Sequence, residues 1–220
     1  MTDAPTFIVA DDHPLFRNAL RQTLEPHFSH VRIVEAGTLD EVAAAIEAAV
    51  EPDLVLFDLS MPGARGFSGL MYLRAQYPAV PVCVVSASED AATIRRTMAM
   101  GAAGFVPKSS PPAQIREAIV TILGGGAWTP PGLDPGNGWS EEDRLAARLR
   151  SLTPQQLRVL MMMAEGMLNK QIAHELGVSE ATVKAHVSAV LQKLGVENRT
   201  RAVLAAGRFE LGQWQANAAD

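Results

Sequence analysis

The chain has 220 residues, a formal net charge of −5 and 48% hydrophobic residues. One ordinary hydrophobic core serves about 100–150 residues, so this length predicts two small domains. The single cysteine, Cys83, excludes an intramolecular disulfide framework and a four-cysteine zinc site. Cys83 lies in an apolar run, which predicts a small buried side chain and not a reactive thiol.

The N-terminus has no basic region followed by an apolar segment, so no secretory signal is visible. No apolar run approaches the ~20 residues that span a bilayer. The sequence therefore predicts a soluble, cytoplasmic protein with no membrane partner. Its charge is uneven, because residues 1–150 carry −6 and residues 151–208 carry +3. A basic C-terminal part permits a polyanion partner, although a solvated charged surface is the more ordinary explanation.

Between residues 6 and 123, short apolar runs alternate with longer segments of helical spacing. This alternation predicts a doubly wound α/β domain around a five-stranded parallel sheet. The central runs are apolar at nearly every position, as expected for strands that helices cover on both faces. The predicted strands are 6–10, 31–36, 53–58, 80–87 and 104–107, and the predicted helices are 14–25, 39–50, 66–77, 89–100 and 112–123.

The stretch 124–150 is rich in glycine and proline and predicts a linker. Near its end, Ser140 is placed to cap a short helix over 140–150. After residue 151 the sequence predicts helices throughout. Thr153, followed by Pro154 and Gln156, has the pattern of a capping box with proline at the first helical position.

Two further helices follow, and they are joined by a tight turn. We expect Asn169 to cap a helix over 170–176 and Ser179 to cap a helix over 180–194. Gly177 lies between them, where the turn needs a residue that accepts positive φ. This arrangement predicts a helix-turn-helix.

Polar side chains follow the predicted strands at one end. Asp11 and Asp12 follow the first strand, Asp58 ends the third, Ser86 ends the fourth and Lys108 follows the fifth. The carboxyl ends of parallel strands meet at one edge of a sheet, where α/β proteins bind ligands. Three carboxylates there would repel one another, and a hard divalent cation such as Mg²⁺ relieves that repulsion. Each residue alone has an ordinary explanation, such as a helix cap or a solvated lysine.

These residues lie in segments that resemble the receiver domain of two-component response regulators, a flavodoxin-like α/β fold. The matching segments are "ADDHPLFR", "DLSMPGARG", "VVSAS" and "GFVPKSS", in that order and spacing. The resemblance implies that Asp58 accepts a phosphoryl group from a phosphohistidine of a sensor histidine kinase. It implies that Asp12, Asp58 and the carbonyl of Ser60 ligate Mg²⁺, with Asp11 acting mainly through a bound water.

The same resemblance implies roles for three residues around the phosphoryl group. Ser86 and Lys108 would bind its oxygens. Phe105 would be the switch aromatic, which turns inward when Ser86 moves toward the phosphate, and a plain aromatic at the edge of the core is the alternative. His13 matches a habit of the family, and we expect it to pack in the first helical turn without a chemical role.

The predicted helix 180–194 has two different faces. One carries an apolar stripe that faces the core: Val183, Val187, Val190, Leu191 and Leu194. The opposite face is small, polar and basic, so it could approach the major groove of DNA closely, and a solvated face is the alternative. That face carries Thr182, Lys184, Ala185, Ser188, Gln192 and Lys193.

The C-terminal stretch resembles the LuxR-type helix-turn-helix of NarL/FixJ-type regulators over about 55 residues. The resemblance implies that bases are read by Lys184, Ala185 and Ser188. It implies that phosphates are contacted by Thr182, Lys170 and Lys193, while His186 either packs or contacts a phosphate. Two positions depart from the family. Gln155 and Gln156 replace its usual charged pair, which loses any ion pair of the usual glutamate, and Ser188 replaces a lysine of some relatives, so no operator preference can be transferred.

Together these observations predict a receiver domain over 1–123, a linker over 124–150 and an all-α helix-turn-helix domain over 151–212. We expect a transcription regulator and not an enzyme, in which phosphorylation of Asp58 controls dimerisation or DNA binding. An active homodimer would present two recognition helices to paired half-sites.

Three other classes are disfavoured by single features. A phosphohydrolase with an aspartyl nucleophile would carry a second acid where Ser60 stands. A stand-alone phosphate relay would lack residues 151–208. A regulator that works without phosphate would lack one of the five pocket residues.

Overall fold

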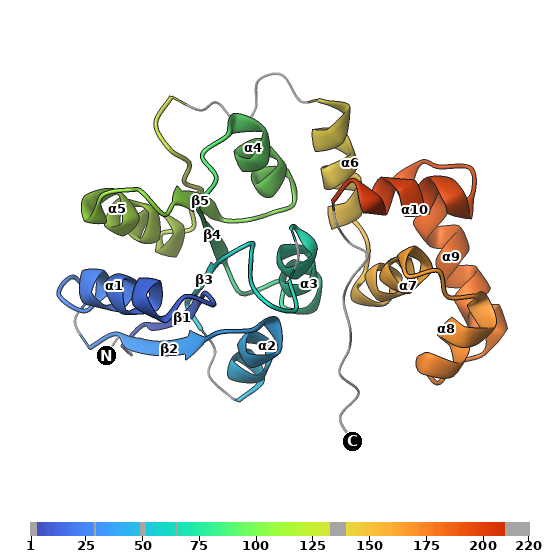
Figure 1. The fold of residues 1–220 in the computed structure, drawn as a ribbon, viewed down its shortest axis with the longest axis horizontal. Helices are drawn as coiled ribbons and strands as arrows, with labels where there is room; N and C mark the ends of the chain where they lie inside the picture. The colour runs from blue at the N-terminus through green and yellow to red at the C-terminus, as the bar shows by residue number, and fades with distance from the viewer. Residues whose placement is uncertain (1–3, 29, 49–51, 65, 133–139, 210–220) are drawn as a thin grey trace.

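The computed structural model describes residues 4–28, 30–48, 52–64, 66–132 and 140–209. Its N-terminal part is a five-stranded parallel sheet in the order β2-β1-β3-β4-β5, with helices on both faces (Figure 1). The strands are β1 (Thr6–Ala10), β2 (Arg32–Ala36), β3 (Leu54–Phe57), β4 (Val82–Ser86) and β5 (Gly104–Pro107). The predicted sheet is confirmed, and β1 and β5 have the predicted bounds.

Five helices alternate with these strands. They are α1 (Pro14–Leu24), α2 (Leu39–Glu47), α3 (Ser68–Gln76), α4 (Ala91–Ala99) and α5 (Pro112–Leu123). The predicted helix 39–50 ends at Glu47, and residues 49–51 lie outside the described part of the chain. Apart from α5, the observed helices are one to three residues shorter than the predicted ones, a difference that is ordinary at helix ends.

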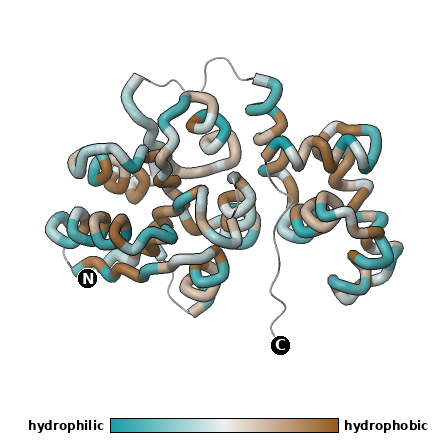
Figure 2. The backbone as a smooth tube through the Cα atoms, viewed as in Figure 1, coloured by the Kyte–Doolittle hydropathy of each residue, from teal (hydrophilic) through white to brown (hydrophobic). Residues whose placement is uncertain are grey.

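The alternation of side chains along β1 shows how the sheet is covered. Phe7 and Val9 lie in the hydrophobic cluster that includes residues of α1 and α5, whereas Ile8 and Ala10 lie in the one that includes residues of α2, α3 and α4. Hydrophobic colour in Figure 2 accordingly concentrates on the strands and on the sides of the helices that face them. Strands β1, β3, β4 and β5 are therefore buried on both faces, as their near-continuous apolar sequences predict, whereas the edge strand β2 is partly exposed.

The C-terminal part is helical. It consists of α6 (Glu141–Arg150), α7 (Pro154–Ala164), α8 (Asn169–Glu175), α9 (Glu180–Leu194) and α10 (Arg199–Gly207). Helices α8 and α9 form the predicted helix-turn-helix, with Gly177 at φ 63° in the turn between them. Helix α10 begins after Asn198, whose side-chain oxygen accepts the Arg201 N–H at 3.0 Å. That cap is a signal from which this helix could have been predicted.

Three of the four predicted caps in this part are confirmed, including Ser179, whose Oγ accepts the Thr182 N–H at 3.1 Å at the start of α9, and one is wrong. Ser140 caps α6, and Thr153 and Gln156 form the predicted capping box of α7. Asn169 does not cap α8, because its Oδ1 accepts a hydrogen bond from Arg199 Nη1 at 3.2 Å. Gln171 takes over at this helix end, where its Oε1 accepts the N–H of Leu168 at 2.7 Å.

The stretch 124–150, predicted as a linker, is anchored at both ends. Trp128 is buried beside β5, and the N–H of Phe105 donates to its carbonyl at 3.0 Å. At the other end, α6 contacts α4 on one side and α9 on the other. The predicted residues 133–139 of the linker and 210–212 of the C-terminal domain lie outside the described part. No helix among the described residues is both long and apolar enough to cross a bilayer.

Candidate functional site

An acidic pocket lies at the carboxyl ends of β1 and β3. In the order β2-β1-β3-β4-β5 the direction of chain winding reverses between these two strands, which is where such sheets bind ligands. Ala10 of β1 pairs with Phe57 of β3, so the residues that follow them, Asp11 and Asp58, emerge side by side. The Asp58 N–H fixes this register by donating to the Ala10 carbonyl at 2.9 Å.

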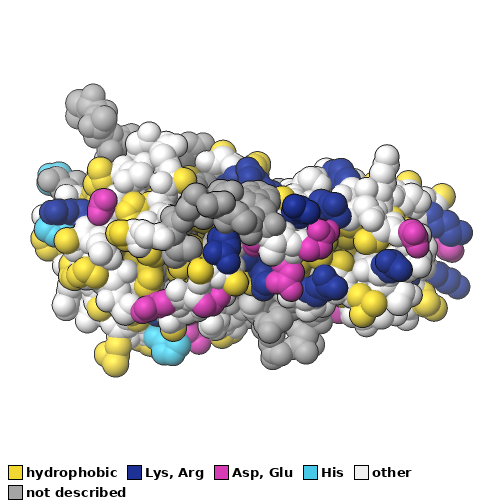
Figure 3. Space-filling view, turned by 90° about the horizontal axis from the view of Figure 1, so that it is seen from above, with side chains coloured by type: hydrophobic (Ala, Val, Ile, Leu, Met, Phe, Trp, Pro, Cys, Tyr) yellow, Lys and Arg dark blue, Asp and Glu magenta, His cyan; other side chains and the backbone are white. Residues whose placement is uncertain are grey.

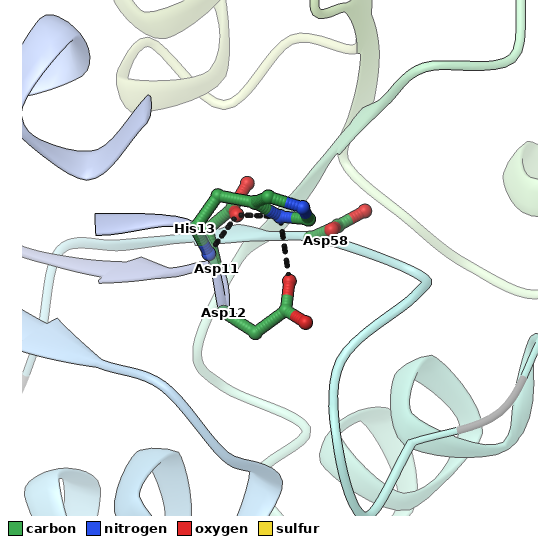
Figure 4. A group of neighbouring side chains, drawn as sticks. All are labelled: Asp11, Asp12, His13 and Asp58. Atoms are coloured by element: carbon green, nitrogen blue, oxygen red, sulfur yellow. Dashed lines mark hydrogen bonds and ion pairs between the residues drawn. The ribbon is translucent and has the colours of Figure 1, made fainter. Parts of the chain in front are cut away.

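Three carboxylates and one imidazole meet in this pocket. The possible ligand atoms of Asp11, Asp12, His13 and Asp58 all lie within 4.8 Å of one another (Figure 4). The side chains of Asp11 and Asp58 are only 2% exposed. Burial of carboxylates is costly unless cations or hydrogen bonds compensate it, so this cluster requires a counter-charge.

Lys108 supplies part of that counter-charge. Its Nζ lies 2.6 Å from Asp11 Oδ2 and 3.0 Å from Asp58 Oδ2, and 4.7 Å from the centre of the Phe16 ring. Burial acts to lower the pKa of the Lys108 ammonium, but its hydrogen bonds and charge contacts with Asp11 and Asp58 raise that pKa, and the balance lies above the usual value. Lys108 is therefore a permanent cation of the pocket.

The other predicted residues lie around Asp58. The N–H of Ser60 donates to Asp58 Oδ1 at 3.3 Å, so the two oxygens of Asp58 have different partners. Ser86 is buried at the end of β4, and its carbonyl accepts the Lys108 N–H at 2.7 Å. Phe105 is completely buried in β5, within the cluster that includes α4, so its ring already points inward in this structure.

His13 has a position that the sequence did not reveal. We predicted that it packs in the first turn of α1, but its side chain is 67% exposed and lies at the pocket. Its Nδ1 is 2.7 Å from Asp12 Oδ1 and 3.1 Å from Asp11 Oδ1. The expectation of a packing role is wrong, because α1 begins directly after His13 and leaves the imidazole beside the carboxylates.

The pocket fits a divalent cation. Its three carboxylates and the Lys108 ammonium leave two uncompensated negative charges, apart from any charge on His13. Asp12 Oδ1 is enclosed, and among the described residues its polar contact is the ion pair with His13 Nδ1 at 2.7 Å. Oxygen atoms of this kind, gathered from two strand ends, are the ligands that hard divalent cations prefer.

The second candidate site is the face of α9 that points away from the protein core. Val183, Val190 and Leu194 are buried, as the predicted apolar stripe requires. Thr182, Lys184, Ala185 and Ser188 are all exposed on this helix, and Lys170 is exposed on α8, while His186 is partly buried. Lys184 Nζ forms an ion pair with Glu180 Oε1 at 3.0 Å. Lysine and arginine side chains gather over this half of the molecule in Figure 3.

Lys193 does not belong to this exposed face. Its Nζ donates to the Ser151 carbonyl at 2.7 Å and to Gln156 Oε1 at 2.8 Å. The ammonium is thus held against the start of α7, and we leave it out of the proposed DNA contacts. Gln156 replaces a usual glutamate of the LuxR-type pattern, so the acceptor for the Lys193 ammonium at this position is a neutral amide oxygen.

Comparisons with known proteins agree with this architecture. Residues 7–120 match the response regulator receiver domain, and residues 150–206 match the bacterial regulatory proteins of the luxR family. The chain belongs to the response regulators that carry a LuxR-type C-terminal domain. It is a transcriptional regulator by family, as the resemblance predicted.

Several curated relatives extend over nearly the whole chain. The glycerol metabolism activator of Pseudomonas putida is 41% identical over 210 residues, which cover 92% of this chain and 95% of that protein. The nitrate/nitrite response regulator homologue of Haemophilus influenzae is 32% identical and covers 93% of this chain and 97% of that protein. The similarity therefore includes both domains in the same order.

Among solved structures, the fold is similar to that of RcsB. The structure of two RcsB dimers bound to two parallel DNAs has a TM-score of 0.54 and 24% identity, and it covers 93% of this chain and 98% of that chain. RcsB of Salmonella enterica serovar Typhimurium bound to a promoter has a TM-score of 0.54 and 25% identity, with coverage of 92% and 98%. These structures confirm an α/β receiver followed by a helical domain.

Proposed function

We propose that Asp58 is the phosphoacceptor of this regulator and that phosphorylation there controls DNA binding by α9. The observation that carries the proposal is the contact of buried Asp58 with Lys108 at the edge of the sheet where Asp11 and Asp12 also converge. A carboxylate in this position has one oxygen beside an ammonium and the other beside a backbone N–H of a surface loop.

The reaction is a phosphoryl transfer between two nucleophiles. An oxygen of Asp58 attacks the phosphorus of a phosphohistidine on a sensor kinase, a P–O bond forms, and the P–N bond breaks as the imidazole leaves with the electron pair. The product is an acyl phosphate on Asp58. Lys108 stays protonated throughout and is placed to contact a phosphoryl oxygen once Asp58 carries the phosphoryl group. Ser86, at the end of the neighbouring strand, is placed to donate to another.

Mg²⁺ fits this pocket. Asp12, Asp58 and the Ser60 carbonyl would hold it directly and Asp11 through a water. When bound, it offsets the charges of the carboxylates and of the incoming phosphoryl oxygens. The protein residues supply the remaining positive charge through Lys108. His13, beside Asp12, adds a nitrogen at the entrance of the same pocket.

The proposed output is DNA binding in the major groove. Helix α9 presents Lys184, Ala185 and Ser188 on an exposed face, with Thr182 and Lys170 placed for phosphate contacts. The solved RcsB structures, in which dimers are bound to DNA, support a homodimer that engages paired half-sites. A phosphohistidine donor and a DNA target also support a cytoplasmic location. Ser86 and Phe105 would convert phosphorylation into a change of the receiver surface.

The test is a mobility-shift titration with DNA fragments that the native protein selects from genomic DNA. Native protein treated with acetyl phosphate and Mg²⁺ should bind with an affinity that differs from that of untreated protein. Asp58→Ala should lose this difference, whereas Asp40→Ala, an exposed carboxylate on α2, should keep it. If the native protein acquires no acid-labile phosphate, the switch is wrong. If it shows no salt-sensitive DNA affinity under any condition, the assignment of α9 is wrong.

A further inference from the structure

Helix α6 lies between the receiver and the helix-turn-helix (Figure 1). It contacts α3 and α4 on one side and α9 on the other. Its buried residues Leu145, Ala146 and Leu149 belong to the same hydrophobic cluster as Met100 of the receiver and Leu157 of α7. Apolar contact on both sides is typical of an element within a core, and a passive tether would not need it.

At the receiver side, α6 is held by Arg96 of α4. The Arg96 guanidinium forms an ion pair with Glu142 in the first turn of α6. Its central carbon lies 5.7 Å from the centre of the Phe67 ring and 5.4 Å from that of Phe209. The guanidinium lies over both rings, which pack edge-to-face, and beside a carboxylate, so cation–π and charge contacts hold it in one orientation. Arg96 therefore joins the receiver to both the start of α6 and the segment after α10.

At the other end, α6 is bonded to the carboxyl end of α9 in both directions. Arg148 Nη1 of α6 donates to the carbonyl of Leu194, the last residue of α9, at 3.3 Å. Lys193 Nζ of α9 donates in return to the carbonyl of Ser151, which follows α6, at 2.7 Å. The last carbonyls of a helix lack helical partners and carry partial negative charge, so cations bind them favourably.

Helix α4 is also connected to the pocket. Ser86 Oγ accepts the N–H of Ser88 at 3.2 Å, and Ser88 Oγ donates to Asp90 Oδ2 at 2.5 Å. Asp90 caps α4 by accepting the Thr93 N–H at 2.8 Å. A movement of Ser86 toward a phosphoryl group therefore acts directly on the first turn of the helix that carries Arg96.

We propose that Glu142, Arg148 and Lys193 are positioning residues through which α6 couples α4 of the receiver to the recognition helix. The coupling sets the placement of α9 and does not cover its DNA face, since Thr182, Lys184, Ala185 and Ser188 are exposed while α6 is bound to both sides. Its response to phosphate rests on the proposed function of Asp58. The physical connection between the domains does not.

The first test measures the coupling. The dissociation constant for a DNA fragment selected by the native protein is determined with and without beryllofluoride, a phosphoryl mimic, in Mg²⁺. The ratio of the dissociation constant without beryllofluoride to that with it should be at least threefold closer to 1 in Glu142→Gln than in the native protein. Glu141→Gln is the matched control, because Glu141 is the neighbouring exposed carboxylate and pairs with Arg144 within α6. A ratio that is unchanged in Glu142→Gln overturns the coupling.

The second test needs no phosphate. Spin labels on Glu117→Cys of α5 and Glu175→Cys of α8, both exposed, report the distance between the domains, while the buried Cys83 stays unlabelled. The native distance distribution should be narrow, and Glu142→Gln with Arg148→Gln should broaden it, whereas Glu141→Gln should not. A broad native distribution, or one that the double variant leaves unchanged, overturns the proposal. If beryllofluoride does not alter DNA binding of the native protein, the phosphoryl switch fails and this distance measurement alone decides the role of α6.

Discussion

The acidic pocket and the DNA-facing side of α9 differ in how much the protein itself determines them. In the pocket, the carboxylates of Asp11 and Asp58 are buried at separate strand ends, and Lys108 contacts both of them. On α9 the proposed contacts are exposed, and Lys184 forms an ion pair with Glu180, one turn away on the same helix. The contacts of buried charged groups lie within the protein and can be read from its structure. The functional contacts of exposed charged groups are made with a partner molecule. The chemistry of the pocket therefore follows from the fold itself, whereas the role of α9 depends on a DNA partner.

The largest expected effect removes a carboxylate from the pocket. Asp12→Asn should weaken Mn²⁺ binding, measured by electron paramagnetic resonance as a stand-in for Mg²⁺, by about tenfold or more, or about 1.4 kcal/mol. The reason is that the neutral amide cannot replace a charged oxygen ligand. Asp40→Asn, an exposed acid outside the pocket, should leave the affinity unchanged. If the native protein and Asp12→Asn bind Mn²⁺ with equal affinity, the metal does not bind at this site.

A second prediction separates two lysines of α9. Lys184→Ala should raise the dissociation constant for a selected DNA fragment about tenfold, because its ammonium is exposed on the proposed contact face. Lys193→Ala should leave the salt dependence of binding unchanged, because its ammonium is already bonded to Ser151 and Gln156. It should lower the free energy of unfolding by about 1 kcal/mol instead. If Lys193→Ala lowers the salt dependence of DNA binding as much as Lys184→Ala does, Lys193 is a DNA contact after all.

A further prediction concerns Cys83, a buried group without a partner charge. Burial raises the pKa of its thiol to about 12, so the reactive thiolate is scarce in the folded protein at pH 8. The unfolded thiol has a pKa near 8.5 and ionises readily. A disulfide reagent should therefore react slowly with the native protein and quickly in urea. Fast reaction without denaturant would place Cys83 outside the core.

Most of the fold was predictable because its signals are local. Apolar runs marked each strand, and the order of strand ends placed Asp11, Asp12 and Asp58 at one edge. The caps at Ser140 and Thr153 were predictable for the same reason, since their partners lie three residues away.

The remaining features depend on contacts between distant segments. The sequence around Asn169 has the pattern of a helix cap, but the Asn169 side chain accepts a hydrogen bond from Arg199, thirty residues later. Lys193 fits the pattern of a DNA contact in the sequence, but its ammonium donates to the carbonyl of Ser151, in the turn before α7. His13 lies at the pocket because α1 begins directly after it. The role of α6 depends on its contacts with both α4 and α9. A composition rich in glycine and proline before α6 gave no sign of these contacts.

The most direct test of the central claim is to locate the phosphoryl group. The native protein is treated with acetyl phosphate in the presence and absence of Mg²⁺, reduced with borohydride to trap acyl phosphates, and mapped by peptide mass spectrometry. The account predicts modification at Asp58, strongly reduced without the metal. Modification at Asp11, Asp12 or a carboxylate outside the pocket, or none at all in Mg²⁺, would contradict it.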